Sequence, residues 1–201
     1  RVITLIRHGQ FERDGAELEL GPRLTKLGKR QALATGRYLR YLPKQNFYAS
    51  PLNRAYETAT LIISCLPDAE VRQSPLLQEV IPTPVPGMRV RNVRQQRANA
   101  DKAFEHFFRP PGGVDRFDCL VCHGNLIRYL MSRVLNVPAA TWLKFDVCNH
   151  CALTECLIDD AGAMRISFYN DVSHLTARLS PHISPFLLTK AASCCIRRLS
   201  R

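Results

Sequence analysis

Two histidines that follow apolar stretches are the residues of this chain best suited to chemistry. The first apolar run ends in Arg7 and His8, a later one ends in His123, and a glycine follows each histidine. Imidazole is a nucleophile and a proton carrier near neutral pH, and a guanidinium binds phosphate through paired hydrogen bonds. The pattern favours phosphoryl transfer, with His8 attacking phosphorus while Arg7 clamps the same phosphate.

The elements that must position these histidines are two strands. Residues 2–6 and 117–122 are mostly apolar, which is typical of strands buried on both faces of a parallel sheet. Carboxyl ends of parallel strands share one edge, where ligands bind, so His8 and His123 are expected to converge. The alternative interpretation, a core histidine satisfied by its neighbours, is less favoured because two histidines stand in matched contexts.

Arg54 is a third candidate for the same phosphate. It lies in the first turn of a predicted helix, with Ser50 as N-cap and Pro51 at the first helical position. A cation at a helix N-terminus opposes the helix dipole, and a phosphate bound by helix amides and guanidinium would explain its placement. In the alternative interpretation, Arg54 pairs with Glu57 or is solvated.

Helical and strand patterns alternate along the rest of the chain. Further helices are expected from Thr25 (as N-cap) to Pro43, over 92–108 and after His123, and further strands at 46–49, 69–72, 151–158 and 163–169. This alternation predicts an α/β fold with a mainly parallel sheet.

The composition is that of an ordinary globular protein. The 201 residues are 46% hydrophobic and 22% charged, enough for one domain with a core. No apolar run approaches the roughly 18 residues needed to span a bilayer, and no secretory signal pattern opens the chain. The 28 basic and 17 acidic residues give a net charge of +11. That charge favours an anionic partner: a phosphorylated substrate, an acidic membrane surface or nucleic acid.

The eight cysteines favour a reducing compartment, because several lie within apolar runs where a free thiol behaves as a small hydrophobic group. Cys119 and Cys122, and likewise Cys148 and Cys151, have a spacing found in zinc sites, which leaves a zinc-binding or nucleic-acid-binding module as an alternative. Cys119 and Cys122 lie three apart on one strand and therefore point to opposite faces. We expect no metal and no nucleic acid.

Five motifs in sequence order resemble the histidine phosphatase (phosphoglycerate mutase-like) superfamily. They are Arg7-His8-Gly9, Leu24-Thr25-x-x-Gly28-x-x-Gln31-Ala32, Ser50-x-x-x-Arg54-Ala55-x-Glu57-Thr58, Leu77-Gln78-Glu79 and His123-Gly124-x-x-Ile127-Arg128. The match covers about residues 1–170. The resemblance implies a phosphoglycerate mutase-like, three-layer α/β/α fold, with a catalytic domain over 1–175 and a basic tail over 176–201.

The resemblance also implies a role for each matched residue. His8 resembles the nucleophile that becomes phosphohistidine, and Glu79 the acid that protonates the leaving group and later activates water. The other members of the phosphate pocket are matched by Arg7, Arg54, His123 and Gly124. The family usually has Arg before the acid and Gly after it, where this chain has Gln78 and Val80. No cofactor is implied, since guanidiniums and a second imidazole disperse the charge of the transferring phosphoryl group.

Within the superfamily the chain resembles the branch of mitochondrial Ser/Thr protein phosphatases. The shared features are Gln10, the Cys-His-x-Asn-x-Ile-Arg-Tyr pattern at 122–129 and a Pro-then-Trp-Leu segment at 138–143. Residues 80–100 are short, whereas mutases carry a longer insertion. The likeness implies a phosphorylated protein or peptide substrate and a mitochondrial location, and it leaves a homo-oligomer open. The alternatives are a small-metabolite phosphatase or mutase, and a non-catalytic phosphoprotein-binding scaffold.

Two basic clusters stand outside the five motifs. Arg89, Arg91, Arg94 and Arg97 lie on or beside the expected substrate loop, where they could bind an acidic phosphopeptide or a second phosphate. A solvated basic face is the alternative. The basic residues of 176–201 could contact an acidic membrane surface.

Overall fold

The computed structural model describes residues 1–12, 19–43 and 45–179. Its strands are β1 (Val2–Arg7), β2 (Asn46–Ala49), β3 (Val71–Gln73), β4 (Phe117–Cys122), β5 (Leu153–Ile158) and β6 (Met164–Asp171). Its helices are α1 (Lys26–Leu39), α2 (Asn53–Ile63), α3 (Val93–Phe107) and α4 (Gly124–Val134), with short 3-10 helices η1 (Pro75–Leu77) and η2 (Ala139–Lys144).

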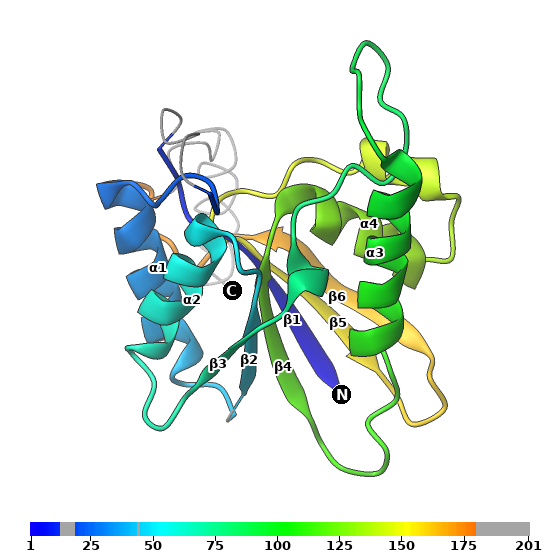
Figure 1. Cartoon of the computed structure of the whole chain (residues 1–201). Helices are drawn as coiled ribbons and strands as arrows, with labels where there is room; N and C mark the ends of the chain where they lie inside the picture. Colours follow the sequence, from blue (N-terminus) through cyan, green and yellow to red (C-terminus); the bar gives the residue numbers. More distant parts are fainter. Residues whose placement is uncertain (13–18, 44, 180–201) are drawn as a thin grey trace, which may run out of the picture.

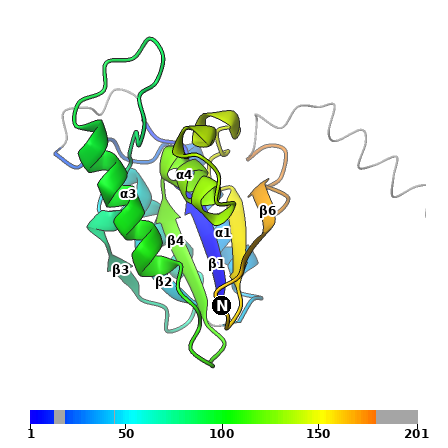
Figure 2. The ribbon, with the colours of Figure 1, turned by 90° about the vertical axis from the view of Figure 1, so that its right-hand side faces the viewer.

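The six strands form one sheet in the order β3-β2-β4-β1-β5-β6. The pairs β1–β4, β2–β4 and β2–β3 are parallel, while β5 runs antiparallel to β1 and β6 antiparallel to β5. Helices α1 and α2 cover one face, and α3 and α4 cover the other (Figures 1 and 2). The predicted three-layer fold with a mainly parallel sheet is confirmed, and its antiparallel pairs are β1–β5 and β5–β6.

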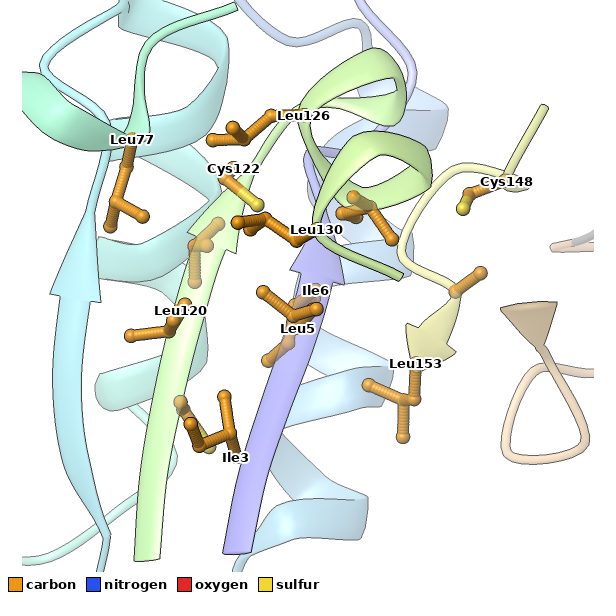
Figure 3. Close-up of a cluster of buried hydrophobic side chains, with 14 of the residues drawn as sticks. Ile3, Leu5, Ile6, Leu77, Leu120, Cys122, Leu126, Leu130, Cys148 and Leu153 are labelled. Atoms are coloured by element: carbon orange, nitrogen blue, oxygen red, sulfur yellow. The ribbon is translucent and has the colours of Figure 1, made fainter. Parts of the chain in front are cut away.

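The core between α4 and the sheet explains why the central strands are apolar on both faces. Leu130 of α4 lies over the ends of β1 and β4, and Leu126 lies beyond them, in the same buried cluster as Leu5 and Leu120 (Figure 3). All four side chains are buried. Because α1 and α2 cover the opposite face, a polar residue in the middle of β1 would lose water on either side.

Several predicted boundaries were wrong by a few residues. Helix α2 begins at Asn53, with Leu52 at the N-cap, so Ser50 is not the N-cap that the Ser-Pro pair suggested. Strand β5 begins at Leu153 rather than at 151, because Cys151 has a φ of +56° and cannot extend a strand. Helix α1 ends at Leu39, a full turn before the proline predicted to stop it.

The N-cap of α1 was predicted correctly. The Thr25 hydroxyl accepts a hydrogen bond of 3.0 Å from the Gly28 backbone N–H. Such a bond satisfies one of the amides that a helix leaves unpaired at its start.

Two further predictions concern membrane contact and the basic C-terminal tail. No helix there is both long enough and apolar enough to cross a membrane. The basic tail expected over 176–201 lies almost wholly outside these residues, which end at Leu179. The proposed membrane contact and the domain boundary near 175 therefore stay predictions.

Candidate active site

The candidate site lies where the sheet's connections reverse. Strands β1 and β4 are parallel neighbours, yet β1 leads to α1 on one face and β4 to α4 on the other (Figure 1). Such a reversal leaves a crevice at the carboxyl ends of the two strands. Arg7 pairs with Cys122 in the register, so His8 and His123 leave the sheet at the same level. Their ring centroids are 5.2 Å apart, as the sequence led us to expect.

Hydrogen bonds orient both nitrogens of His8. Nδ1 donates to the Gly9 carbonyl at 2.9 Å, and the Arg54 Nε–H donates to Nε2 at 3.2 Å. The side chain is buried, and burial lowers the pKa of His8 well below 6.5, helped by His123 and the cationic Arg7. The ring is therefore neutral near pH 7, with its proton on Nδ1 and its lone pair on Nε2.

His123 is held in the opposite sense. Its Nε2 shares a hydrogen bond of 2.9 Å with the Ser50 hydroxyl, and the Ser50 N–H donates to the Val121 carbonyl of β4 at 3.0 Å. Its Nδ1 is buried and has no partner among the described residues. Burial, then Arg54 and Arg7, lower the pKa of His123 well below 6.5. Nδ1 is thus the atom through which this ring can bind a ligand.

The Arg7 guanidinium is fixed at one side and unpartnered at the other. It donates to the Cys148 carbonyl, and its buried Nε has no partner among the described residues. Burial lowers the pKa of Arg7 below its ordinary value. A guanidinium stays charged under these conditions, so Arg7 brings a partly desolvated positive charge to the site.

Arg54 reaches the site from the first turn of α2. Its guanidinium lies over the Phe11 ring at 5.3 Å as well as donating to His8. The alternative pairing with Glu57 is wrong: Glu57 accepts the Leu24 N–H at 2.8 Å and pairs with Lys29 at 3.1 Å. Glu57 therefore does not explain the unfavourable dipole placement of Arg54.

Glu79 completes the group of sequence-predicted residues. Burial raises the pKa of Glu79, and the Val80 N–H, bonded to its carboxylate at 3.2 Å, and the charges of Arg54 and Arg7 oppose that rise. The charges of both guanidiniums thus act on the Glu79 carboxyl. A carboxyl with a raised pKa holds its proton closer to neutral pH and is suited to donate it.

The two glycines after the histidines have different structural roles. A Cβ on Gly9 would lie 2.8 Å from the Gly28 carbonyl oxygen of α1, so Gly9 allows loop and helix backbones to touch. The Gly9 N–H is bonded to Thr58 Oγ1 at 3.0 Å. A Cβ on Gly124 would lie 3.5 Å from Arg7 Nε, in ordinary contact. The close approach that Gly9 permits is therefore with the backbone of α1.

Sequence reasoning missed two rings beside His8. The centroid of Phe11 lies 5.2 Å from that of His8, and that of His150 lies 5.5 Å away. His150 Nδ1 is also 3.2 Å from the His8 carbonyl oxygen. The available signals were weak: an aromatic residue two positions after Gly9, and a histidine 142 positions further along that only the fold brings close.

The cysteines offer no metal centre within the described residues, where no group of three or more His, Cys, Asp or Glu is arranged to hold an ion. The six cysteines described there are free. Burial raises the pKa of the Cys119 and Cys122 thiols far above 9, which disfavours the thiolate that zinc requires. The zinc-module interpretation therefore has no support from this geometry.

Comparisons with known proteins give the chain its relatives. Residues 3–119 match the family described as the histidine phosphatase superfamily (branch 1). "Serine/threonine-protein phosphatase Pgam5, mitochondrial" of Caenorhabditis elegans is 34% identical over 187 residues, which cover 87% of this chain and 64% of that protein. The Xenopus laevis protein of the same description is 32% identical over 188 residues, covering 88% and 67%. The chain thus spans about two thirds of the length of these relatives.

Solved structures show the same fold. A phosphoglycerate mutase from Plasmodium falciparum superposes with a TM-score of 0.62 at 31% identity, covering 87% of this chain and 93% of that one. A phosphoserine phosphatase mutant from Entamoeba histolytica, in complex with phosphoserine, gives a TM-score of 0.67 at 20% identity, covering 87% and 99%.

Proposed function

The chain belongs to the histidine phosphatase superfamily, and from this premise we propose that it hydrolyses phosphomonoesters through a phosphohistidine formed on His8. The observation that carries the proposal is the pair of hydrogen bonds on His8. Nδ1–H is held by the Gly9 carbonyl, so Nε2 keeps its lone pair and faces the Arg54 guanidinium. A nucleophilic nitrogen is thereby directed at the place where an anion would be bound.

In the first step the substrate phosphate lies between His8 Nε2 and the donors around it. Arg7 Nε, His123 Nδ1 and the Arg54 guanidinium bind its oxygens, and the phosphate takes over the Arg54 hydrogen bond from His8. Nε2 attacks phosphorus, the bond to the ester oxygen breaks, and Glu79 gives that oxygen its proton. Phosphoryl transfer depends mainly on such positioning and dispersed positive charge, so this scheme uses no metal ion.

In the second step the phosphoryl group passes from His8 to water. Glu79, now a carboxylate, takes a proton from the attacking water. The nitrogen–phosphorus bond breaks, inorganic phosphate forms, and His8 returns to its neutral state. Glu79 therefore serves as acid and then as base, with its pKa raised by burial and lowered by the Arg54 and Arg7 charges.

We further propose phosphorylated Ser and Thr of proteins as the substrate and a mitochondrial location. Support comes from relatives that are named mitochondrial Ser/Thr protein phosphatases, at 31–35% identity. The homo-oligomer that the resemblance left open is also part of this proposal. The rival is a small-metabolite phosphatase or mutase, which the 31% identical phosphoglycerate mutase structure favours.

The experiment compares purified wild type with Glu79→Gln on two kinds of ester. Wild type is expected to hydrolyse p-nitrophenyl phosphate and phosphoserine or phosphothreonine peptides, with higher kcat/KM on the peptides than on 3-phosphoglycerate. Glu79→Gln is expected to lose about 10²-fold or more of the phosphoenzyme formation rate on phosphoserine peptide. On p-nitrophenyl phosphate, whose leaving group needs no proton, this step should change far less.

The outcomes separate the rivals. Preference for phosphoglycerate, with phosphoryl exchange that requires a bisphosphate primer, would establish the mutase. Phosphopeptide binding without turnover of any ester would establish the scaffold. Equal losses on both esters would remove Glu79 from its role as leaving-group acid.

A further inference from the structure

We propose that an arginine-bearing loop next to the active site, residues 81–92 with the adjoining first turn of α3, docks acidic side chains that flank the phosphorylated residue of a protein substrate. The inference rests on the proposed function, because it concerns which phosphoproteins that site would prefer. It assigns a partner chemistry to a surface that the catalytic scheme does not use.

The loop begins beside the catalytic residues. Its first residue, Ile81, lies two positions after Glu79, and its end leads into α3 at Val93. In both views the loop rises beyond the sheet on the side where β1 and β4 end (Figures 1 and 2). A peptide whose phosphate reaches His8 must carry its neighbouring residues along this edge.

The base of the loop is held in a defined shape. Gln96 of α3 bonds both ends: its Oε1 accepts the Ile81 N–H at 2.7 Å, and its Nε2 donates to the Arg91 carbonyl at 2.9 Å. The buried Trp142 donates from its indole N–H to Thr83 Oγ1 at 2.7 Å. A surface fixed in this way costs less entropy to order on binding than a floppy chain.

The upper part of the loop is exposed and carries uncompensated positive charge. Arg89, Arg91 and Arg94 are exposed, and none forms an ion pair within the part of the chain that the structure describes. The sequence has no acidic residue between Glu79 and Asp101. Other arginines of the same fold, such as Arg1 and Arg116, do pair with a carboxylate.

Charge complementarity identifies the occupant. Three unpaired guanidiniums in high dielectric repel one another weakly and attract carboxylates, which they can bind through two parallel hydrogen bonds. A peptide tethered by its phosphate at the active site presents its flanking carboxylates at high effective concentration. An acidic stretch beside the phosphorylated residue therefore fits this loop, whereas a neutral stretch gains nothing from it.

The test compares two charge-matched triple variants. Arg89→Gln/Arg91→Gln/Arg94→Gln removes the loop charges. Its control, Arg37→Gln/Arg72→Gln/Arg165→Gln, removes three exposed arginines of α1, β3 and β6, which lie outside the loop. Each is measured with a phosphoserine peptide flanked by Glu and Asp, with the same peptide carrying Gln and Asn instead, and with p-nitrophenyl phosphate.

Wild type is expected to favour the acidic peptide in kcat/KM by about tenfold, since a few exposed ion pairs act together. The preference should shrink as salt is raised from about 50 to 500 mM. The loop variant should lose most of it, the control should keep it, and p-nitrophenyl phosphate should be hydrolysed equally by all three. Fluorescence anisotropy of the same peptides on inactive His8→Ala protein should show the same discrimination in Kd.

Three results would overturn the inference. Wild type that hydrolyses both peptides equally and binds both equally contradicts the docking role while leaving the phosphatase proposal intact. An equal loss of preference in both triple variants assigns it to net charge rather than to the loop. Binding to phosphatidylserine vesicles that only the loop variant loses, with peptide preference unchanged, makes the loop a membrane contact. If no ester is hydrolysed, the phosphatase proposal fails, and the anisotropy measurement still decides the docking role.

Discussion

The ends of β1 and β4 carry the same dipeptide, His-Gly, and the fold treats the two copies differently. At β1, His8 donates from Nδ1 to the Gly9 carbonyl, and its Nε2 accepts the Arg54 Nε–H. At β4, His123 shares a hydrogen bond between Nε2 and the Ser50 hydroxyl, and its Nδ1 has no partner among the described residues. Opposite nitrogens are thus available at the two strand ends. The first arrangement suits a nucleophile, the second a hydrogen-bond donor to a bound oxygen.

The glycines differ for a related reason. Gly9 lies against the backbone of α1, where no side chain fits, while Gly124 opens α4 with room for one. One strand end is a crowded turn that fixes the His8 ring. The other is a helix start that leaves space beside the Arg7 guanidinium. Identical residue pairs therefore acquire different chemistry from the elements that follow them.

The largest effect is expected when the proposed nucleophile at the end of β1 is removed. His8→Ala is expected to lower kcat on p-nitrophenyl phosphate by about 10⁴-fold or more, because no covalent intermediate can form. No acid-labile phosphoenzyme should be trapped in a rapid quench. His106→Ala, which removes an exposed histidine of α3, is the control and should leave kcat unchanged. Trapped phosphoenzyme in His8→Ala would assign the nucleophile to another residue.

A smaller effect is expected at the other strand end. His123→Ala is expected to lower kcat by about 10²- to 10³-fold, the usual cost of losing one donor to a developing charge. The phosphoenzyme should still form, more slowly, and quench-flow measurement of its rate tests this. If His123→Ala abolishes the phosphoenzyme while His8→Ala keeps it, the two roles are reversed.

The glycines give the third comparison, in stability. Gly9→Ala is expected to lower the free energy of unfolding by about 1–3 kcal/mol, since its Cβ must displace the backbone of α1. Gly124→Ala should change it by less than about 1 kcal/mol and in the stabilising direction, since alanine is the better helix former. Guanidinium chloride unfolding of both variants measures the difference. Equal losses would show that the Gly9 loop yields easily.

The pH dependence of stability gives the fourth comparison. Burial lowers the pKa of both histidines below 6.5, so the unfolded chain takes up protons that the folded chain does not. Stability is therefore retained above about pH 6.5 and lost as pH falls, by up to about 1.4 kcal/mol per unit for each histidine. His123→Gln should remove one such contribution. Unfolding titrations between pH 7 and 5 with an unchanged slope in this variant would show that His123 is already charged in the folded state.

Local patterns carried much of the fold. The buried runs that became β1 and β4 were visible because apolar residues without alternation have few other uses, and Thr25 marked the start of α1 by its own side chain. The Ser-Pro pair misled us about α2 because the Ser50 hydroxyl has a second possible partner. In the fold it bonds His123, a residue 73 positions away, and also accepts the Leu52 N–H at 3.3 Å, while the helix begins only at Asn53.

The sequence by itself determined which chemistry this chain can attempt: it places two histidines and two arginines on strand ends and a helix start, and the family resemblance adds Glu79. Only the tertiary structure decided which nitrogen of each histidine is available, which carbonyls and hydroxyls hold the rings, and that Phe11 and His150 stand beside them. The physical reason is how far apart in the sequence the interacting groups lie. Strand burial and helix starts depend on neighbours a few residues away, whereas hydrogen-bond direction and desolvation depend on groups brought together by the packing of whole elements.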